Sequence, residues 1–458
     1  MELEFTGKKV LVIGAGISGF AAAKIARQRG AAVVLSDAKA EEELKYDFSE
    51  LRGLGVELAF GPQEESLLEG VSMLILSPAV PVRVPIVQAA YGRNIRVLTE
   101  VEMAYELARS PIAAVTGTNG KTTTVTLLGL LLEAHYGKEK TGVGGNIGVP
   151  LSEEALRVGA KGAIAAEISS YQMEATADFH PHVATVLNVT PDHVLRHGSL
   201  EVYQQMKEKM FAQLSAGDML VLNYDDEKVR GMAERAPRGA GIFYFSREKY
   251  LDRGVCLAGD LIVLRWGGRL YPLCREGELG IKGGHNVENA MAAIASAFFM
   301  GVSPADMVPV LQSFRGVEHR IEPVRELNGV AYYNDSKATN TDSAIKAVAA
   351  FEHILLIAGG DDKMTDLTEF MQLVKERCDE LILVGAAAER FRQEALNNGY
   401  PGEHIHMAGY SMEAAVQKAH ELAHAPQTVL LSPACASFDM YTGFEERGRD
   451  FKRLVNGL

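Results

Sequence analysis

The chain has little cysteine and no long apolar run, and each shortage excludes a class of protein. Its four cysteines show no C-x-x-C spacing, which argues against a disulfide framework and a zinc knuckle. No apolar run approaches the roughly 18 residues that a membrane-spanning helix needs. The first residues, MELEFTGKKV, lack the features of a signal peptide. We therefore expect a cytoplasmic protein.

The 46 basic residues are outnumbered by 59 acidic ones, which gives a formal net charge of −13. A charge of this sign disfavours nucleic acid and an anionic membrane as partners. It does not exclude anionic small molecules, because single lysines and glycine-rich loops bind phosphates locally. The composition, 47% hydrophobic and 23% charged, is typical of a globular protein. The length predicts about three domains.

Apolar runs of strand length alternate with helix-length segments, a pattern typical of α/β domains with parallel sheets. We find no internal repeat and no low-complexity linker. Residues 240–282 are the exception, because their Gly, Tyr, Phe and Val content predicts short antiparallel strands. The expected parallel strands are 10–13, 33–36, 73–77, 112–115, 163–166, 184–187, 219–222, 354–357, 381–384 and 429–431.

The most informative string is TGTNGKTTT at residues 116–124, between a predicted strand and a predicted helix at 125–132. Its glycines let the backbone N–H groups point inward, and the helix adds its positive end, which suits phosphates. Lys121 is expected to reach the β- and γ-phosphates of ATP, and the Thr122 hydroxyl to hold Mg²⁺. The expected ATP-binding residues of this loop are Gly117, Thr118, Asn119, Gly120, Lys121, Thr122 and Thr123.

A second glycine-rich loop, GAGISG at residues 14–19, follows the first predicted strand and opens a helix. Asp37 ends the next strand, where an acid can accept hydrogen bonds from a ribose hydroxyl. The pattern is compatible with NAD, with any nucleotide diphosphate on a helix N-terminus, or with a plain tight turn. The separate ATP loop makes NAD less favoured, because few dehydrogenases carry one.

Polar residues follow two further strands of the central region. Glu167 ends a strand beside the ATP loop, where its carboxylate would suit Mg²⁺, although a solvated strand end is the alternative. Asn188, Asp192 and His193 lie in a turn after the next strand, at the sheet edge where ligands bind. A lone histidine there is more often a surface residue. Composition alone predicts that Lys207, on a helix expected at 201–214, is exposed.

The C-terminal half contains further polar clusters. Asn286, in GGHNVENA, has the position of a helix cap. The string NDSKATN at 334–340 crowds more Asp, Lys, Thr and Asn together than a cap requires. Lys363 follows a glycine turn and offers a cation to an anionic group. Cys435, in LLSPACASFD, has no base nearby in sequence, so we do not interpret it as a nucleophile.

With EHR at 318–320, these strings make the whole chain resemble the Mur ligases of bacterial peptidoglycan synthesis. They match best the members that add D-glutamate, and YNDSKATN with the final SPACASFD and FEERG strings is highly specific. The resemblance implies an α/β protein of three domains. They are a Rossmann-like UDP-binding domain at 1–99, a central P-loop-type ATPase domain at 100–316, and a Rossmann-like amino-acid-binding domain at 317–458.

The resemblance also implies a reaction and its participants. ATP would phosphorylate the carboxylate of UDP-N-acetylmuramoyl-L-alanine, and the amine of D-glutamate would attack the acyl phosphate. Magnesium would assist, and the enzyme would act as a monomer without nucleic-acid or membrane partners. Two alternatives remain. One is a ligase for another amino acid, such as the alanine-adding Mur ligase or a folate polyglutamate ligase. The other is a nucleotide-dependent sensor without ligation.

The family roles map onto this sequence residue by residue. The implied catalytic residues are Lys121, Glu167, His193 and Lys207, with Lys207 carbamylated. The implied Mg²⁺ ligands are Thr122, Glu167, His193 and the carbamate of Lys207. ATP would also contact Asn286, Arg320 and Asp335. The nucleotide sugar would contact Ile17, Ser18, Asp37, Lys39, Asn146 and His193. D-Glutamate would contact Thr339, Lys363, Ser437, Phe438 and Phe444.

Three positions depart from the family pattern. Ala79 stands where glycine is usual, which puts a backbone contact to the diphosphate in doubt. Leu195 replaces an acid, which puts any role of that acid in doubt. The residues after Asp37 lack a hydroxyl group that is often present. None of these changes alters the predicted catalytic lysines.

Overall fold

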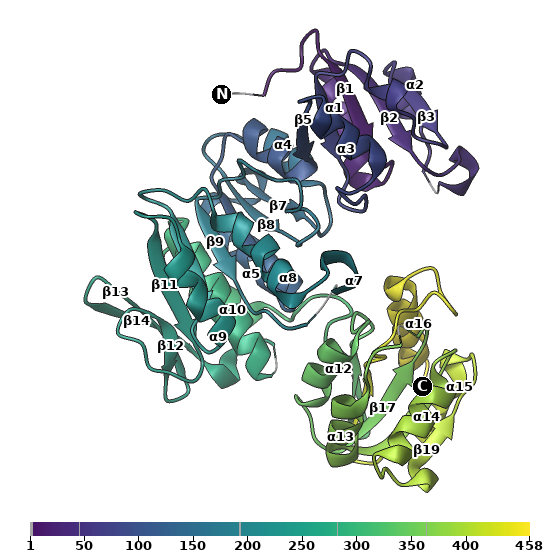
Figure 1. Cartoon of the computed structure of the whole chain (residues 1–458). Coiled ribbons are helices and arrows are strands. Elements are labelled where there is room, and N and C mark those ends of the chain that lie inside the picture. The colour runs from purple at the N-terminus through teal and green to yellow at the C-terminus, as the bar shows by residue number, and fades with distance from the viewer. Residues whose placement is uncertain (1–2, 45, 192–193, 282, 363) are drawn as a thin grey trace. The chain divides into compact units, whose positions relative to one another are not determined.

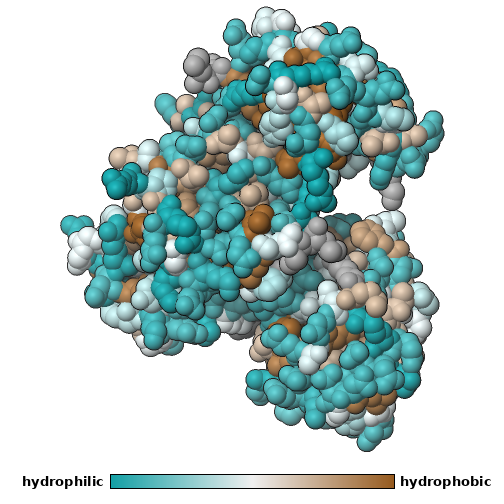
Figure 2. Space-filling model, in the orientation of Figure 1, coloured by the Kyte–Doolittle hydropathy of each residue, from teal (hydrophilic) through white to brown (hydrophobic). Residues whose placement is uncertain are grey.

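The computed structural model describes residues 3–44, 46–191, 194–281, 283–362 and 364–458. Its compact units are Met1–Glu278 with Glu288–Gln312, and Leu279–Val287 with Ser313–Leu458. Helices flank sheets of mainly parallel strands, so the expected α/β fold is confirmed (Figure 1). Among the described residues, no helix is long and apolar enough to cross a membrane. The face drawn in Figure 2 is mostly hydrophilic, with hydrophobic residues scattered over it.

The N-terminal sheet, purple in Figure 1, is parallel and has the order β3-β2-β1-β4-β5. Its strands are β1 (Lys9–Ile13), β2 (Ala32–Asp37), β3 (Glu57–Phe60), β4 (Met73–Leu76) and β5 (Arg96–Thr99). Its helices are α1 (Ile17–Gln28), α2 (Ser49–Gly53), α3 (Pro85–Gly92) and α4 (Glu100–Leu107). Val10 and Val12 pack in one apolar cluster and Leu11 and Ile13 in another, so both faces of β1 are covered.

The central sheet has the order β14-β13-β12-β11-β10-β9-β6-β8-β7. Its strands are β6 (Ile112–Thr116), β7 (Thr141–Gly145), β8 (Ala163–Glu167), β9 (Val183–Val186), β10 (Met219–Asn223), β11 (Gly241–Ser246), β12 (Gly254–Ala258), β13 (Leu261–Trp266) and β14 (Arg269–Arg275). The neighbouring helices are α5 (Lys121–Tyr136), α6 (Leu151–Arg157), α7 (Val194–His197), α8 (Leu200–Glu208), α9 (Glu227–Arg230), α10 (Gly284–Phe299) and α11 (Pro304–Ser313). The phosphate-loop string therefore follows β6, which lies between β9 and β8.

Two details of the central region differ from the sequence-based prediction. The antiparallel prediction for 240–282 is right for β12, β13 and β14 but wrong for β11, which pairs parallel with both β10 and β12. The reason is that β11 is reached by a crossover through α9 and extends the parallel sheet. The helix expected at 201–214 ends at Glu208, and a 3₁₀ turn at Lys209–Phe211 follows it.

The C-terminal sheet has the order β15-β16-β20-β17-β18-β19, and only the β15–β16 pair is antiparallel among the described pairings. Its strands are β15 (Glu322–Leu327), β16 (Val330–Asn334), β17 (Ile354–Gly359), β18 (Cys378–Val384), β19 (Ile405–Met407) and β20 (Thr428–Leu431). Its helices are α12 (Thr341–Val348), α13 (Thr368–Arg377), α14 (Ala388–Asn397), α15 (Met412–Leu422) and α16 (Phe444–Asn456). The loops after β16, β20 and β17 therefore leave three adjacent strands.

Candidate active site

The GAGISG loop lies where the strand order of the N-terminal sheet reverses, between β1 and β4. Gly14 has a φ of +95°, and a Cβ built on it would lie 2.6 Å from the Cβ of Ser77, so the two loops approach closely only with glycine. A pocket of about 360 Å³ opens there, at the position where parallel α/β sheets bind ligands. Its walls include Ile17, Ser18, Ser77, Ala79, Asn146 and Gln172.

Asp37 supports this loop from the end of β2. One carboxylate oxygen accepts a hydrogen bond from the N–H of Ala15 at 2.8 Å, and the other accepts one from the N–H of Lys39 at 3.0 Å. The Lys39 side chain is exposed. Ala79 is absent from the described residues with positive φ, so the departure from glycine causes no backbone strain at that position.

The phosphate loop ends at Gly120, which caps α5 with a left-handed φ of +83°. A Cβ built there would lie 2.1 Å from Oδ1 of Asn289, so glycine is required for space as well as for conformation. The ammonium of Lys121 donates to the carbonyls of Gly117 and Thr118, each at 2.7 Å. The lysine and the N-terminus of α5 thus lie together at the carboxyl end of β6, as the sequence predicts.

Asn188, just after β9, holds the phosphate loop in shape. Its side-chain oxygen accepts from the N–H of Asn119 at 2.8 Å, and its amide donates to the Asn119 carbonyl at 3.2 Å. Its own carbonyl accepts from the N–H of Thr118 at 3.0 Å. The sequence marked Asn188 only as a turn residue. This supporting role depends on the β6–β9 pairing, in which Thr116 is the register partner of Val186.

Glu167 ends β8 beside β6, where its register partner is Val115. Its side chain is 2% exposed, so the prediction of a position beside the loop is confirmed and the solvated alternative is wrong. Oε1 accepts from the Asn146 amide at 2.8 Å, whereas Oε2 is buried and has no hydrogen-bond partner among the described residues. A buried carboxylate oxygen of this kind is costly without a partner, and it fits a divalent cation.

Lys207 is 1% exposed on α8, and its Nζ lies 4.1 Å from the centroid of the Tyr203 ring. The composition-based prediction of an exposed lysine is therefore wrong, because the face of α8 that carries Lys207 packs inward. Buried lysines are rare without a compensating group. His193, the remaining expected ligand, lies outside the described residues, as does its neighbour Asp192.

Asn286, Arg320 and Asp335, the other expected ATP contacts, lie in the second compact unit. Asp335 follows β16 and accepts hydrogen bonds from the Ser432 hydroxyl at 2.8 Å and from the N–H of Ile321 at 3.2 Å. Burial raises the pKa of Asp335 to about 7, and the Ser432 hydrogen bond and the Arg320 charge only partly oppose this shift. The carboxyl therefore exchanges its proton near neutral pH.

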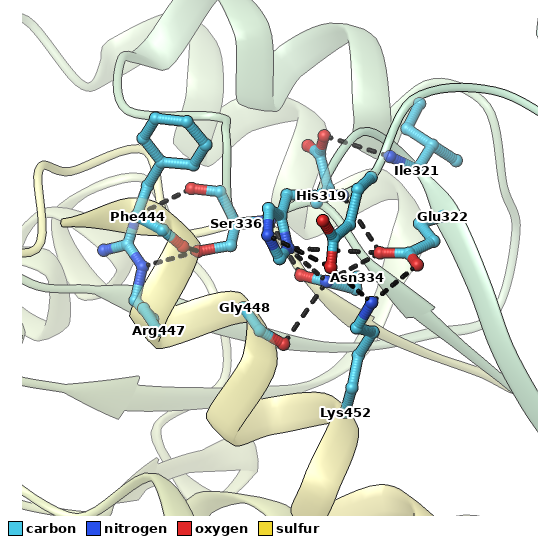
Figure 3. Close-up of polar contacts among 11 residues, drawn as sticks. His319, Ile321, Glu322, Asn334, Ser336, Phe444, Arg447, Gly448 and Lys452 are labelled. Carbon is cyan, nitrogen blue, oxygen red and sulfur yellow. Dashed lines mark hydrogen bonds and ion pairs between the residues drawn. The ribbon is translucent and has the colours of Figure 1, made fainter. Parts of the chain in front are cut away.

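Arg447, on α16, is 2% exposed and connects two loops of the C-terminal sheet. Figure 3 shows its contacts with Ser336, in the first of these loops. It donates to the hydroxyl and the carbonyl of Ser336 at 2.9 and 2.8 Å. It also donates to the carbonyls of Ala436 and Cys435 at 2.9 and 3.1 Å. Burial lowers its pKa to about 10, which still leaves it charged at neutral pH. Sequence reasoning used the FEERG string but did not assign this arginine a role.

A second group of contacts from α16 holds Asn334, the last residue of β16 (Figure 3). Its amide donates to the Gly448 carbonyl at 3.4 Å and to Glu322 at 3.0 Å, and it lies 2.9 Å from Nδ1 of His319. Glu322 in turn pairs with Lys452 at 2.9 Å. The string that starts at Asn334 is therefore fixed at its first residue by the helix that also carries Arg447.

The expected D-glutamate residues are distributed around these loops. Ser437 is buried, Thr339 is half-buried, and Phe438 is 71% exposed. The Phe444 carbonyl accepts from the Ser336 hydroxyl at 2.8 Å. The loops after β17 and β20 are joined, because the N–H of Gly359 donates to the Pro433 carbonyl at 2.9 Å and the N–H of Asp361 to the Ala436 carbonyl at 3.0 Å. Lys363 lies outside the described residues.

Cys435 lies in the middle of the loop after β20 and is buried. Burial raises the pKa of its thiol to about 12, so the thiolate is scarce at neutral pH. This environment agrees with the interpretation that Cys435 is not a nucleophile.

Comparison with protein families matches three segments of the chain. Residues 8–99 match the N-terminal domain of MurD-like Mur ligases, residues 115–297 the Mur ligase middle domain, and residues 319–435 the glutamate ligase domain of Mur ligases. The UDP-N-acetylmuramoylalanine–D-glutamate ligase of Pelotomaculum thermopropionicum is 45% identical over the whole chain and 99% of its own length. The enzyme of the same name from a Thermoanaerobacter species is 42% identical, with complete coverage of both chains.

Solved structures share the fold at low sequence identity. The UDP-N-acetylmuramate-alanine ligase of Thermotoga maritima is 19% identical with a TM-score of 0.59, over 98% of this chain and 99% of that one. A pseudomurein peptide ligase of Methanothermus fervidus is 18% identical with a TM-score of 0.58, over 98% and 100% of the two chains. At this identity the likeness extends to the fold alone.

Proposed function

This chain belongs to the Mur ligase family, and we propose that it joins D-glutamate to UDP-N-acetylmuramoyl-L-alanine in an ATP-dependent reaction. The observation that carries the proposal is the 45% identity, over the full chain, to a relative with that name. The match of the N-terminal segment to MurD-like domains supports the same choice over other members of the family. Peptidoglycan precursor synthesis in the cytoplasm, by a monomer, is the proposed setting.

The chemistry explains why a phosphate loop belongs in an amide-forming enzyme. A free carboxylate is a poor electrophile, so one of its oxygens first attacks the γ-phosphorus of ATP and ADP leaves. The amine of D-glutamate then attacks the acyl carbon, an amide forms, and inorganic phosphate carries the carboxylate oxygen away. Gly120 and Lys121, at the N-terminus of α5, would bind the transferring phosphoryl group electrostatically.

Magnesium is the proposed metal, because the unpartnered Oε2 of buried Glu167 offers the hard oxygen ligand that Mg²⁺ prefers. Thr122, His193 and a carbamylated Lys207 would complete the protein ligands. Carbamylation replaces the positive ammonium with a carboxylate-like group, which suits a cation site. When bound, Mg²⁺ would neutralise the charge that develops on the phosphate oxygens.

The substrates would occupy the groups of residues described above. The pocket between β1 and β4 would take the UDP end of the nucleotide sugar. The proposed contacts there are Ile17, Ser18, Asp37, Lys39, Asn146 and His193. D-Glutamate would bind at Thr339, Lys363, Ser437, Phe438 and Phe444. Asn286, Arg320 and Asp335 would contact ATP. Domain limits at 99/100 and 316/317 belong to the same proposal.

Phosphate release from ATP, measured with each co-substrate omitted in turn, tests the proposal. Release should require both UDP-N-acetylmuramoyl-L-alanine and D-glutamate. A panel of D- and L-amino acids separates the alternatives, because a pocket built on fixed polar contacts rejects a misplaced amine. A faster rate with L-alanine or L-glutamate would favour another ligase of the superfamily. Release without any amino acid would favour a nucleotide-dependent sensor.

A further inference from the structure

Arg196, on the short helix α7, connects the central region of the first unit to the N-terminal sheet. Its Nε and Nη2 donate to the two carboxylate oxygens of Glu174 at 2.7 and 2.8 Å. Its Nη1 donates to the Ala79 carbonyl at 3.3 Å, and its Nη2 also reaches the Pro78 carbonyl at 3.4 Å. The Arg196 and Glu174 side chains are 12% and 9% exposed. The ion pair is therefore largely shielded from water.

The guanidinium is committed to protein atoms. An arginine side chain has five N–H donors, and four of them are used by the two oxygens of Glu174 and the two loop carbonyls. One face of the guanidinium lies 4.8 Å from the centroid of the Tyr171 ring. Arg196 is therefore placed to orient protein groups and not to act as the main ligand of an anion.

The segment that carries Glu174 is itself anchored by hydrogen bonds, so it can support the contact with Arg196. The ammonium of Lys209 donates to the carbonyls of Met173 and Glu174 at 3.0 and 2.8 Å. Burial lowers the pKa of Lys209, and the carboxylate charges of Glu102 and Glu174 oppose that shift. Lys209 therefore anchors the backbone at Glu174, and Arg196 anchors its carboxylate.

The loop that Arg196 holds is one wall of the pocket between β1 and β4. Ser77, Pro78 and Ala79 line that pocket opposite the start of α1. Two of these three residues have carbonyls that accept hydrogen bonds from Arg196, and Arg83, a few residues further on, donates to the Arg196 carbonyl at 3.4 Å. The loop and α7 are thus connected in both directions.

We propose that Arg196 is a positioning residue for the nucleotide sugar, fixing the wall at Ser77–Ala79 in its binding shape. The inference rests on the proposed function of that pocket. Because the wall is already fixed in the free protein, less conformational entropy is lost when the ligand binds. Loss of the Arg196 contacts should therefore lower the affinity for the nucleotide sugar. The affinity for ATP should stay unchanged, because Asn188 holds the phosphate loop separately.

Calorimetric titration of the full chain with UDP-N-acetylmuramoyl-L-alanine, and separately with ATP, tests the inference. Arg196→Ala removes two hydrogen bonds to the wall, so we expect nucleotide-sugar affinity to fall roughly 10-fold or more. Arg196→Lys keeps the charge but not the planar fork, so it should recover only part of the affinity. Glu174→Gln, which releases the guanidinium, should act in the same direction, and KM for the nucleotide sugar should rise more than kcat falls.

Arg96→Ala is the matched control. Arg96, on β5, also joins the N-terminal sheet to the central region, through Asp178 at 3.7 Å, but it lies away from this pocket. Its loss should leave nucleotide-sugar affinity within about two-fold. Unchanged affinity in Arg196→Ala and Glu174→Gln, or an equal loss for ATP, would overturn the inference. Failure of the unmodified chain to bind the nucleotide sugar would instead refute the proposed function.

Discussion

At the scale of single residues, Lys207 shows that composition can predict the wrong exposure for a side chain, because it is expected to be exposed and is buried. A lysine on an amphipathic helix is usually exposed, and only the resemblance to a known family singled this one out. Its burial depends on how α8 packs against the sheet, which the local sequence does not encode. Glu167 was easier to predict, because the end of a parallel strand beside a phosphate loop is a general ligand position.

The proposed carbamylation of Lys207 predicts how substitutions at this position should affect activity. Lys207→Ala should lose most ligase activity, and high concentrations of a small carboxylate such as acetate should restore part of it. Lys207→Arg keeps a positive charge and cannot form the carbamate, so it should stay inactive with or without acetate. Incubation with ¹³C-bicarbonate should give a carbamate signal in the wild-type protein and in neither variant. Near-normal turnover of Lys207→Arg, with an unchanged melting temperature, would refute the carbamate.

Asp335 predicts a pH-dependent contribution to stability. Its folded-state pKa of about 7 lies above the ordinary value of 3.8, so between these pH values the folded state binds a proton that the unfolded state does not. Stability should therefore fall as pH rises from about 4 to about 7. Asp335→Asn removes this slope. Urea unfolding of both proteins at pH 5 and pH 8 measures it, and an equal stability difference at the two pH values would contradict the assignment.

At the scale of elements, the turn into α5 requires glycine for two separate reasons. Gly120→Ala would place a Cβ in the left-handed region and against Asn289, so ATP affinity should fall about 10-fold or more as the loop shifts. Gly217→Ala is the control, because Gly217 has a φ of +100° but no atom within 4 Å of a built Cβ. It should cost about 1–2 kcal/mol of stability and leave ATP affinity intact. Equal ATP affinities of the two variants, measured by titration, would refute the steric role of Gly120.

The helix α16 predicts a coupled effect on two loops. Arg447→Lys cannot reproduce the four hydrogen bonds to Ser336, Cys435 and Ala436, and each buried carbonyl left without a partner costs about 1–3 kcal/mol. The variant should melt earlier, and KM for D-glutamate should rise at least several-fold. Arg453→Ala removes only a largely exposed ion pair with Asp450 from the same helix and should do neither. Unchanged D-glutamate kinetics in Arg447→Lys would contradict this role.

The existence of many strands was predictable, because short apolar runs between turn residues are typical of buried parallel strands. β1, β2, β6, β8 and β17 lie within a residue or two of their predicted positions. Six strands were missed: β3, β5, β7, β15, β16 and β19. Several of them, such as TGVGG and IHM, lack a continuous apolar run. The direction of β11 was mispredicted because pairing depends on the crossover and not on the composition of the strand.

At the scale of the whole molecule, the loops predicted from separate strings lie at the carboxyl ends of parallel strands within each compact unit. Contacts that cross between strands were not predictable from spacing, and these include Asn188 with the phosphate loop and Arg196 with the wall of the pocket. Each depends on tertiary pairing that only the fold supplies. The proposed activity therefore depends on motifs that the sequence identifies. It also depends on supporting residues, such as Asn188 and Arg196, whose roles only the fold reveals.

In the proposed mechanism, the carboxylate is activated by phosphorylation before D-glutamate attacks it. The most direct measurement uses UDP-N-acetylmuramoyl-L-alanine labelled with ¹⁸O in both oxygens of the alanyl carboxylate. Mass spectrometry of the products should find one ¹⁸O in inorganic phosphate and one in the new amide. Unlabelled phosphate, or AMP in place of ADP, would rule out the acyl-phosphate step.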